Sequence, residues 1–213
     1  MHLHSYLDQF PLIGIFRGLK PDEALAVADP VLEAGFQILE IPMNSPQPLQ
    51  SIELLAKRFP DQIVGGGTVM SPDDVKRIAA VGGRLIFMPH SDPAVIRQAK
   101  LSGLLCIAGV ATPTEAFAAL ANGADALKLY PAEQLAPVVV KAWRAVVPSQ
   151  HRLLPVGGIT PQSMKPYLLA GANGFGLGSA LYKAGMTPGT VKANAIAFRD
   201  EVRRLTDEGL FKA

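Results

Sequence analysis

The sequence predicts a (β/α)8 barrel, the fold in which eight parallel strands alternate with helices around one closed sheet. Two observations carry this prediction. Short apolar runs alternate with longer segments of helical periodicity eight times over roughly 170 residues. Glycine-rich strand ends follow the seventh and eighth runs, which is where such barrels form a phosphate site. The length of 213 residues fits one domain. We therefore expect a single barrel domain over residues 1–213, with flanking helices at its N- and C-terminal ends.

Eight near-continuously apolar runs are expected to be the strands. Strands of a parallel sheet that are covered on both faces lack the alternation of polar and apolar residues seen in half-exposed strands. In chain order the runs cover residues 11–17, 36–42, 62–68, 84–89, 104–110, 125–131, 152–158 and 173–179.

Helical segments follow almost every run. Three of them begin with Ser or Thr followed by Pro and end in Gly, and a fourth is a close variant. These four segments cover residues 71–83, 112–123, 160–171 and 91–103. The segment 20–35 has Pro21 at an N1-like position, acidic residues in its first turn and Gly35 as its C-cap. Each of these boundaries is a signal that can be checked against the structure.

Two prolines interrupt otherwise helical patterns. Proline lacks the backbone N–H that a helix interior uses. A kink or a late helix start is therefore possible at Pro30 and at Pro166. The last stretch, residues 187–209, has the periodicity of an amphipathic C-terminal helix.

An open, doubly wound sheet is the competing architecture. Its phosphate loop normally follows the first strand. In this chain the glycine-rich strand ends come late, which favours the barrel.

Composition excludes several classes of function. Lys and Arg number 20 and Asp and Glu 18, so the formal net charge is only +2, too small to indicate a nucleic-acid or membrane partner. The chain has no apolar run of membrane-spanning length, and its start, "MHLHSYLDQFP", lacks the features of a signal peptide. We therefore expect a soluble, cytoplasmic protein.

Cysteine and histidine usage gives no sign of a metal site. The single cysteine, Cys106, excludes a disulfide framework and lies in an apolar run, where it is expected to be a small core residue. His2, His4 and His151 show no metal-ligand spacing.

An inward-facing lysine and glutamate are the strongest functional signals. In "ADALKLYPAE" strand alternation places Lys128 on the face opposite Leu127 and Leu129, so the lysine points into the barrel. The same count on the second run turns Ile38 and Glu40 inward. Because a barrel interior is a packed core of side chains, a lysine and a glutamate there need an explanation.

Two explanations for this pair remain open at this point. A purely structural Lys–Glu ion pair is one, although buried ion pairs are a poor source of stability. A Schiff-base lysine is the other, because burial lowers the pKa of an amine by up to about 3–5 units and leaves it neutral and nucleophilic near pH 7.

Further candidates come from the other strand ends. Glycines after the seventh and eighth runs, in "VGGIT" and "GLGSAL", expose backbone amides ahead of a helix and are expected to cradle phosphate. The "GGGT" run beginning at Gly65 is a weaker signal, for which close backbone packing is the alternative. The expected binding residues are Arg17, Thr68, Pro89, Gly157, Gly158, Gly178 and Ser179. His90 is expected to be a loop or helix-cap residue, with a part in proton transfer as the alternative.

With these residues in hand, the chain resembles the aldolases that cleave 2-keto-3-deoxy-6-phosphogluconate or its galactonate epimer. The resemblance covers nearly the whole chain and rests on "EAGFQILEIPMNSP", "VGGGTV", "ALKLYPAE" and "PVGGITP". It implies a (β/α)8 fold, a class I mechanism without metal or other cofactor, and a homotrimer. By position it implies that Lys128 forms the Schiff base, that Glu40 is the acid and base, and that Thr68 and the late glycines bind substrate.

Departures from the gluconate branch point to the galactonate branch. That branch has an arginine four residues after the glutamate and a threonine before Gly-Gly; here these positions are Asn44 and Val156. The resemblance implies that Arg17, in "FRG", replaces the missing cation, and it is expected to hold either the carboxylate or the phosphate. The resemblance thus implies 2-dehydro-3-deoxy-6-phospho-D-galactonate as substrate, with pyruvate and D-glyceraldehyde 3-phosphate as products.

Three alternatives stay open on the sequence alone. The gluconate epimer could be the main substrate. A phosphate-binding barrel isomerase or synthase would use the same glycines but has no need of an inward lysine. A non-catalytic sugar-phosphate binder has little use for a costly Lys–Glu pair.

Overall fold

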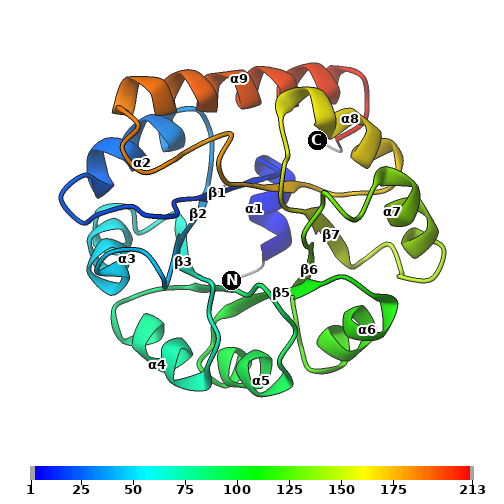
Figure 1. The fold of residues 1–213 in the computed structure, drawn as a ribbon, viewed down its shortest axis with the longest axis horizontal. Coiled ribbons are helices and arrows are strands. Elements are labelled where there is room, and N and C mark those ends of the chain that lie inside the picture. Colours follow the sequence, from blue (N-terminus) through cyan, green and yellow to red (C-terminus); the bar gives the residue numbers. More distant parts are fainter. Residues whose placement is uncertain (1–2, 212–213) are drawn as a thin grey trace.

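The apolar runs pair as the strands of one parallel sheet, which curls into a barrel ringed by helices (Figure 1). This computed structural model describes residues 3–211. All eight predicted strands are present, each shorter than its apolar run. They are β1 Leu12–Ile15, β2 Ile38–Pro42, β3 Ile63–Gly67, β4 Leu85–Phe87, β5 Leu105–Val110, β6 Ala126–Leu129, β7 Arg152–Pro155 and β8 Phe175–Leu177. The predicted (β/α)8 barrel is confirmed.

The barrel has a seam between β7 and β8. Neighbouring strands pair in the order β7-β6-β5-β4-β3-β2-β1-β8, so these two strands stand at the ends of the hydrogen-bonded series. A bridge between Val156 and Gly176, and a 2.9 Å backbone bond from Asn173 N to Leu153 O, span the seam. The glycine-rich strand ends predicted from the sequence lie directly above it.

Proline in the first turn starts most of the surrounding helices, as the sequence signals predicted. The helices after the strands are α2 Ala24–Glu33, α3 Pro48–Arg58, α4 Pro72–Ala80, α5 Pro93–Leu101, α6 Pro113–Ala121, α7 Pro137–Arg144, α8 Pro161–Leu169 and α9 Pro188–Asp207. Ser71 caps α4 by accepting a hydrogen bond from Asp74 N, and Thr112 and Glu115 form a reciprocal capping box on α6.

The expected helix start at Pro21 is wrong. Residues 21–23 form a turn, and α2 begins at Ala24. The carboxylate of Glu23 is used to hold this turn, because it accepts hydrogen bonds from Lys20 N at 3.1 Å and from Tyr182 Oη at 3.0 Å. Pro30 and Pro166 remain inside α2 and α8.

The two terminal helices have different places in the fold. The helix predicted at residues 187–209 is α9, which takes the eighth position of the ring and packs against α2 and α8 (Figure 1). The N-terminal helix, α1 Leu3–Gln9, lies across the amino ends of the strands (Figure 1). Its buried Leu3 and Leu7 join the apolar side chains inside the barrel, so α1 closes that end of the core.

A separate, larger core lies between the sheet and the helices, and Cys106 belongs to it. The cysteine is fully buried, and burial raises the pKa of its thiol to about 12. This confirms the expectation of a small core residue. Over residues 3–211, no helix is both long and apolar enough to cross a membrane.

Candidate active site

The carboxyl ends of the strands surround a cavity of about 430 Å³ that brings most of the predicted site residues together. Strand polarity explains this, because in a parallel barrel every strand delivers its last residues to the same rim. The predicted residues that line the cavity are Arg17, Glu40, Lys128, Gly157, Gly158, Gly178 and Ser179. Thr68, Pro89 and His90 are outside this lining.

Lys128 is buried inside the barrel, with only 5% of its surface exposed. Its Nζ lies 4.5 Å from the ring centroid of Phe87 and 4.4 Å from that of Tyr130, so the amine contacts two aromatic faces. Burial lowers the pKa of Lys128 to about 8, an effect that Glu40 opposes and Arg17 reinforces. The structure therefore places a lysine at the floor of the cavity whose neutral form is more populated near pH 7 than that of an ordinary lysine.

Glu40 is the buried carboxylate of the same site and is only 2% exposed. Burial raises the pKa of Glu40 to about 7, against the opposing effects of Lys128 and Arg17. Among residues 3–211 its Oε2 atom has no hydrogen-bond partner. A carboxyl group with a pKa near 7 can both accept and donate a proton at neutral pH.

Gly67 provides the space in which the Glu40 carboxylate lies, a role that the sequence interpretation missed. A Cβ atom added to Gly67 would lie 1.7 Å from Glu40 Oε2 and 2.3 Å from its Cδ. The preceding Gly65 and Gly66 are equally crowded, by Leu85 O at 2.1 Å and by the Ile78 side chain at 2.3 Å. The "GGGT" run therefore serves close packing, which was the alternative raised for it.

Arg17 is oriented by the loop that follows β2. Its Nη1 donates to Asn44 Oδ1 at 2.8 Å and its Nη2 to Thr68 Oγ1 at 3.4 Å. Next to it, Gly18 N donates to the buried Ser45 Oγ at 3.0 Å. The guanidinium is thus directed toward the β2 and β3 side of the rim, and Thr68 joins the site through Arg17.

The late glycines form the opposite wall. Gly157 and Gly158 have φ values of 115° and 62°, a backbone conformation that strongly favours glycine. They precede Thr160 and the N-terminus of α8. A Cβ added to Gly178 would meet no atom within 4 Å, so the backbone there is open to the cavity. Backbone amides in such a turn, ahead of a helix, suit an anion.

The lining also contains residues that were not assigned from the sequence, among them Tyr130, Glu133 and Lys183. Tyr130 shares the inward strand face with Lys128, so alternation alone could have found it. Glu133 and Lys183 lie in loops after β6 and β8, for which periodicity gives no direction.

Pro89 and His90 pack against the neighbouring strand. His90 O accepts a hydrogen bond from Gly109 N at 3.0 Å, and a Cβ on Gly109 would lie 2.4 Å from the carbonyl carbon of Pro89. In the part of the chain that the structure describes, His90 Nδ1 is buried without a hydrogen-bond partner. This is the loop position expected for His90.

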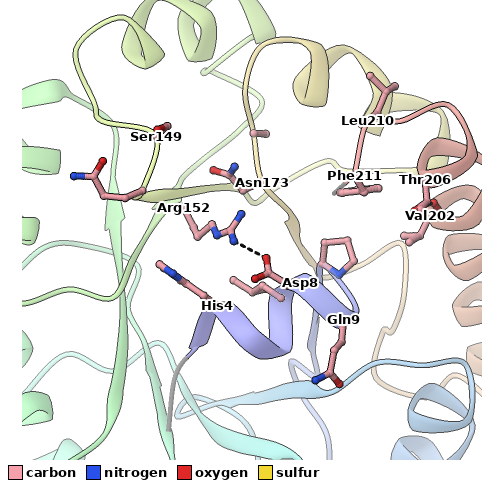
Figure 2. A pocket seen from close by; sticks show the side chains of 14 residues that line it. His4, Asp8, Gln9, Ser149, Arg152, Asn173, Val202, Thr206, Leu210 and Phe211 are labelled. Carbon is pink, nitrogen blue, oxygen red and sulfur yellow. Dashed lines mark hydrogen bonds and ion pairs between the residues drawn. The ribbon is translucent and has the colours of Figure 1, made fainter. Parts of the chain in front are cut away.

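A second cavity, of about 570 Å³, lies at the other end of the barrel beside α1 (Figure 2). An ion pair of 2.5 Å between Arg152 and Asp8 crosses it. It contains none of the predicted site residues. Within residues 3–211 no group of three or more His, Cys, Asp or Glu side chains is placed to hold a metal ion, and His2 lies outside the described residues.

Comparison with known proteins identifies the chain's relatives. The family model described as "Aldolase: KDPG and KHG aldolase" matches residues 3–195. A probable 2-dehydro-3-deoxy-6-phosphogalactonate aldolase of Rhizobium meliloti is 48% identical, over 88% of this chain and 89% of its own length. The 2-dehydro-3-deoxy-6-phosphogalactonate aldolase of Escherichia coli K12 is 44% identical, over 89% of this chain and 93% of its own length.

Relatives of the gluconate type are more distant. The KHG/KDPG aldolase of Escherichia coli K12 is 28% identical over 77% of both chains. Among solved structures, one described as native KDPGal superposes with a TM-score of 0.92 and 42% identity, covering 93% of this chain and 97% of that one.

The contact between Gly67 and Glu40 predicts a coupled effect on stability. Gly67→Ala should lower the free energy of unfolding by about 1–3 kcal/mol, because the added methyl group overlaps the buried carboxylate. In a Glu40→Ala background the same change should cost less than about 0.5 kcal/mol. Urea unfolding of the four proteins measures the coupling.

Gly189→Ala is the matched control, because a Cβ there would meet only Thr187 Oγ1, at 3.8 Å. An equal cost of Gly67→Ala in both backgrounds would show that the glycine is needed for a reason other than Glu40.

Proposed function

The chain belongs to the KDPG and KHG aldolase family, and from this premise we propose that it cleaves 2-dehydro-3-deoxy-6-phospho-D-galactonate into pyruvate and D-glyceraldehyde 3-phosphate. As a member of this family it is an aldolase, a carbon–carbon lyase. The observation that carries the proposed mechanism is a buried Lys128 with a lowered pKa, close enough to a buried Glu40 for each to shift the other's pKa.

Lys128 supplies the nucleophile. With a pKa of about 8, about one-tenth of the amine is neutral at pH 7, whereas an ordinary lysine is neutral in fewer than about one molecule in a thousand. The neutral Nζ attacks the keto carbon of the substrate, and loss of water gives a protonated imine. This imine accepts the electron pair that is released when the bond between carbons 3 and 4 breaks.

Glu40 moves the protons. Its ionised form takes the proton of the carbon-4 hydroxyl, directly or through a water, and the aldehyde leaves as the carbon–carbon bond breaks. The carboxylic acid formed in this way returns a proton to carbon 3 of the enamine. Water then hydrolyses the pyruvate imine and regenerates Lys128. Both protonation states of Glu40 are populated at neutral pH because its pKa is about 7.

Arg17 binds the carboxylate in this proposal. Its charge affects the pKa of both Lys128 and Glu40, so the guanidinium lies near the imine. The substrate carboxylate is bonded to the imine carbon, whereas the phosphate is carried four carbons further along. The contacts with Asn44 and Thr68 also turn Arg17 toward the β2 and β3 side. This leaves the phosphate to Gly157, Gly158, Gly178 and Ser179 on the seam side.

The galactonate epimer is favoured as substrate by identity. Relatives named for it are 44–48% identical to this chain, against 28% for the KHG/KDPG aldolase of Escherichia coli. Asn44 and Val156 also depart from the gluconate pattern, as the sequence interpretation noted.

A homotrimer remains part of the proposal. Large apolar side chains on the outer helices support an assembly: Leu101 is 84% exposed, Val138 74% and Leu169 64%. The cytoplasmic location stays a prediction from the sequence.

Lys128→Ala should abolish cleavage, because it removes the imine nucleophile. Borohydride reduction in the presence of pyruvate, followed by mass spectrometry, should add a reduced pyruvate to the wild-type protein and not to the variant. Lys141→Ala, an exposed lysine on α7, is the control and should still be labelled. Turnover by a folded Lys128→Ala protein would refute the imine mechanism.

The charges around Lys128 predict two opposite shifts in pH dependence. The rate of imine formation with pyruvate should rise with pH up to about 8, since the neutral amine predominates above that value. Glu40→Gln removes a charge that raises the pKa of Lys128, so the midpoint should move to lower pH. Arg17→Ala removes a charge that lowers it, so the midpoint should move to higher pH. Shifts in the same direction in both variants would contradict this electrostatic arrangement.

The proposed carboxylate role of Arg17 predicts a loss with every 2-keto acid. Arg17→Ala should raise KM for pyruvate and for the phosphorylated substrate alike, by about ten- to a hundredfold, the value of a charge-assisted hydrogen bond. Arg17→Lys should recover only part of the loss, because an ammonium lacks the planar fork of donors. An increase confined to the phosphorylated substrate would assign Arg17 to the phosphate instead.

A further inference from the structure

Two charged residues line the cavity without a part in the reaction described above. Glu133, in the loop after β6, and Lys183, in the segment after β8, both face the seam side. The four groups proposed to bind phosphate on that side are backbone amides and one hydroxyl, which carry no net charge. The formal charges on that side of the cavity lining are therefore those of Glu133 and Lys183.

Glu133 lies against the glycine pair. A Cβ added to Gly157 would lie 2.3 Å from Glu133 Oε2, and one added to Gly158 would lie 3.3 Å from Oε1. The carboxylate thus lies beside the backbone turn that is proposed to receive the phosphate. The negative charge of Glu133 would repel a phosphate bound in this turn, because like charges in close proximity repel each other.

Lys183 is held at the same end by the residue before it. Tyr182 is 2% exposed, packs edge-on against Phe16 with ring centroids 5.5 Å apart, and donates to Glu23 Oε1 at 3.0 Å. This anchor fixes the backbone from which the exposed Lys183 reaches the cavity.

The other two cations of the lining are engaged elsewhere. Arg17 contacts Asn44 and Thr68, and Lys128 lies against two rings at the floor of the cavity. Over residues 3–211, no hydrogen bond or ion pair occupies the ammonium group of Lys183. Lys183 is therefore the cation available to a phosphate.

We propose that Lys183 and Glu133 set the affinity for the phosphorylated end of the substrate with opposite signs. Lys183 attracts the phosphate and contacts it, and Glu133 weakens its binding. The inference rests on the proposed function, and it names the charges that distinguish a phosphorylated substrate from an unphosphorylated one. Because both side chains are exposed, the effect of each should depend on ionic strength.

Inorganic phosphate is a suitable probe, measured as a competitive inhibitor of cleavage at low ionic strength. Lys183→Ala should raise its inhibition constant about three- to tenfold, the range between an exposed ion pair and a charge-assisted hydrogen bond. Glu133→Gln should lower the constant by about two- to fivefold. Both differences should shrink when the ionic strength is raised to about 0.5 M. Lys183→Arg should keep the wild-type value.

Lys141→Ala removes the same charge away from the cavity and should leave the inhibition constant unchanged. The inference is overturned if the inhibition constant for phosphate is unaltered in either Lys183→Ala or Glu133→Gln. A change in the direction opposite to the expected one overturns it as well. Borohydride trapping of pyruvate tests the proposed function separately, since pyruvate carries no phosphate. Trapping that succeeds while the phosphate constants stay unaltered would reject only the roles of Glu133 and Lys183.

Discussion

The burial of Lys128 and Glu40 inside one barrel is the constraint on which the rest of the site depends. Removing each group from water disfavours its charged form. The opposite charge of the partner partly offsets this effect. The outcome is a pair whose two pKa values both lie much closer to neutrality than they would in water. Stability alone does not explain such a pair, since a packed apolar core would serve as well. The surrounding residues can be understood as support for it: Gly67 leaves space for the carboxylate, and Phe87 and Tyr130 enclose the amine.

The seam between β7 and β8 gives the cavity its second half. Gly157, Gly158 and Gly178 follow the residues that are bridged across this seam, and they line the cavity. Glycines at both sides of the seam keep the backbone groups there accessible. Arg17, in contrast, is turned away from the seam by Asn44. One end of the cavity therefore presents the Arg17 guanidinium, and the other combines backbone groups with the side chains of Glu133 and Lys183, which suits a substrate with an anion at each end.

The sequence predicted what depends on periodicity and on strand polarity. Lys128 and Glu40 were placed inside the barrel by alternation alone, and helix starts with Ser or Thr before Pro were correct because the caps are local. Features that depend on a neighbouring strand could not be found in this way. The requirement for Gly67 arises from a side chain on β2, and the turn before α2 is held partly by a contact between Glu23 and Tyr182, which is 159 residues away. Lys183 and Glu133 lie in loops, whose directions only the closed barrel fixes.

Helix α1 has a consequence for the order in which the molecule is completed. It seals the inner core with Leu3 and Leu7, and Asp8 pairs with Arg152, 144 residues later. Because Arg152 is made 144 residues after Asp8, this ion pair cannot form until β7 has been synthesised. Leu3 and Leu7 pack among inward side chains contributed by strands from β1 to β7, so α1 can complete the inner core only when the late strands are in place. Helix α1 precedes every strand of the barrel in the sequence, yet it is among the last elements to reach its final place.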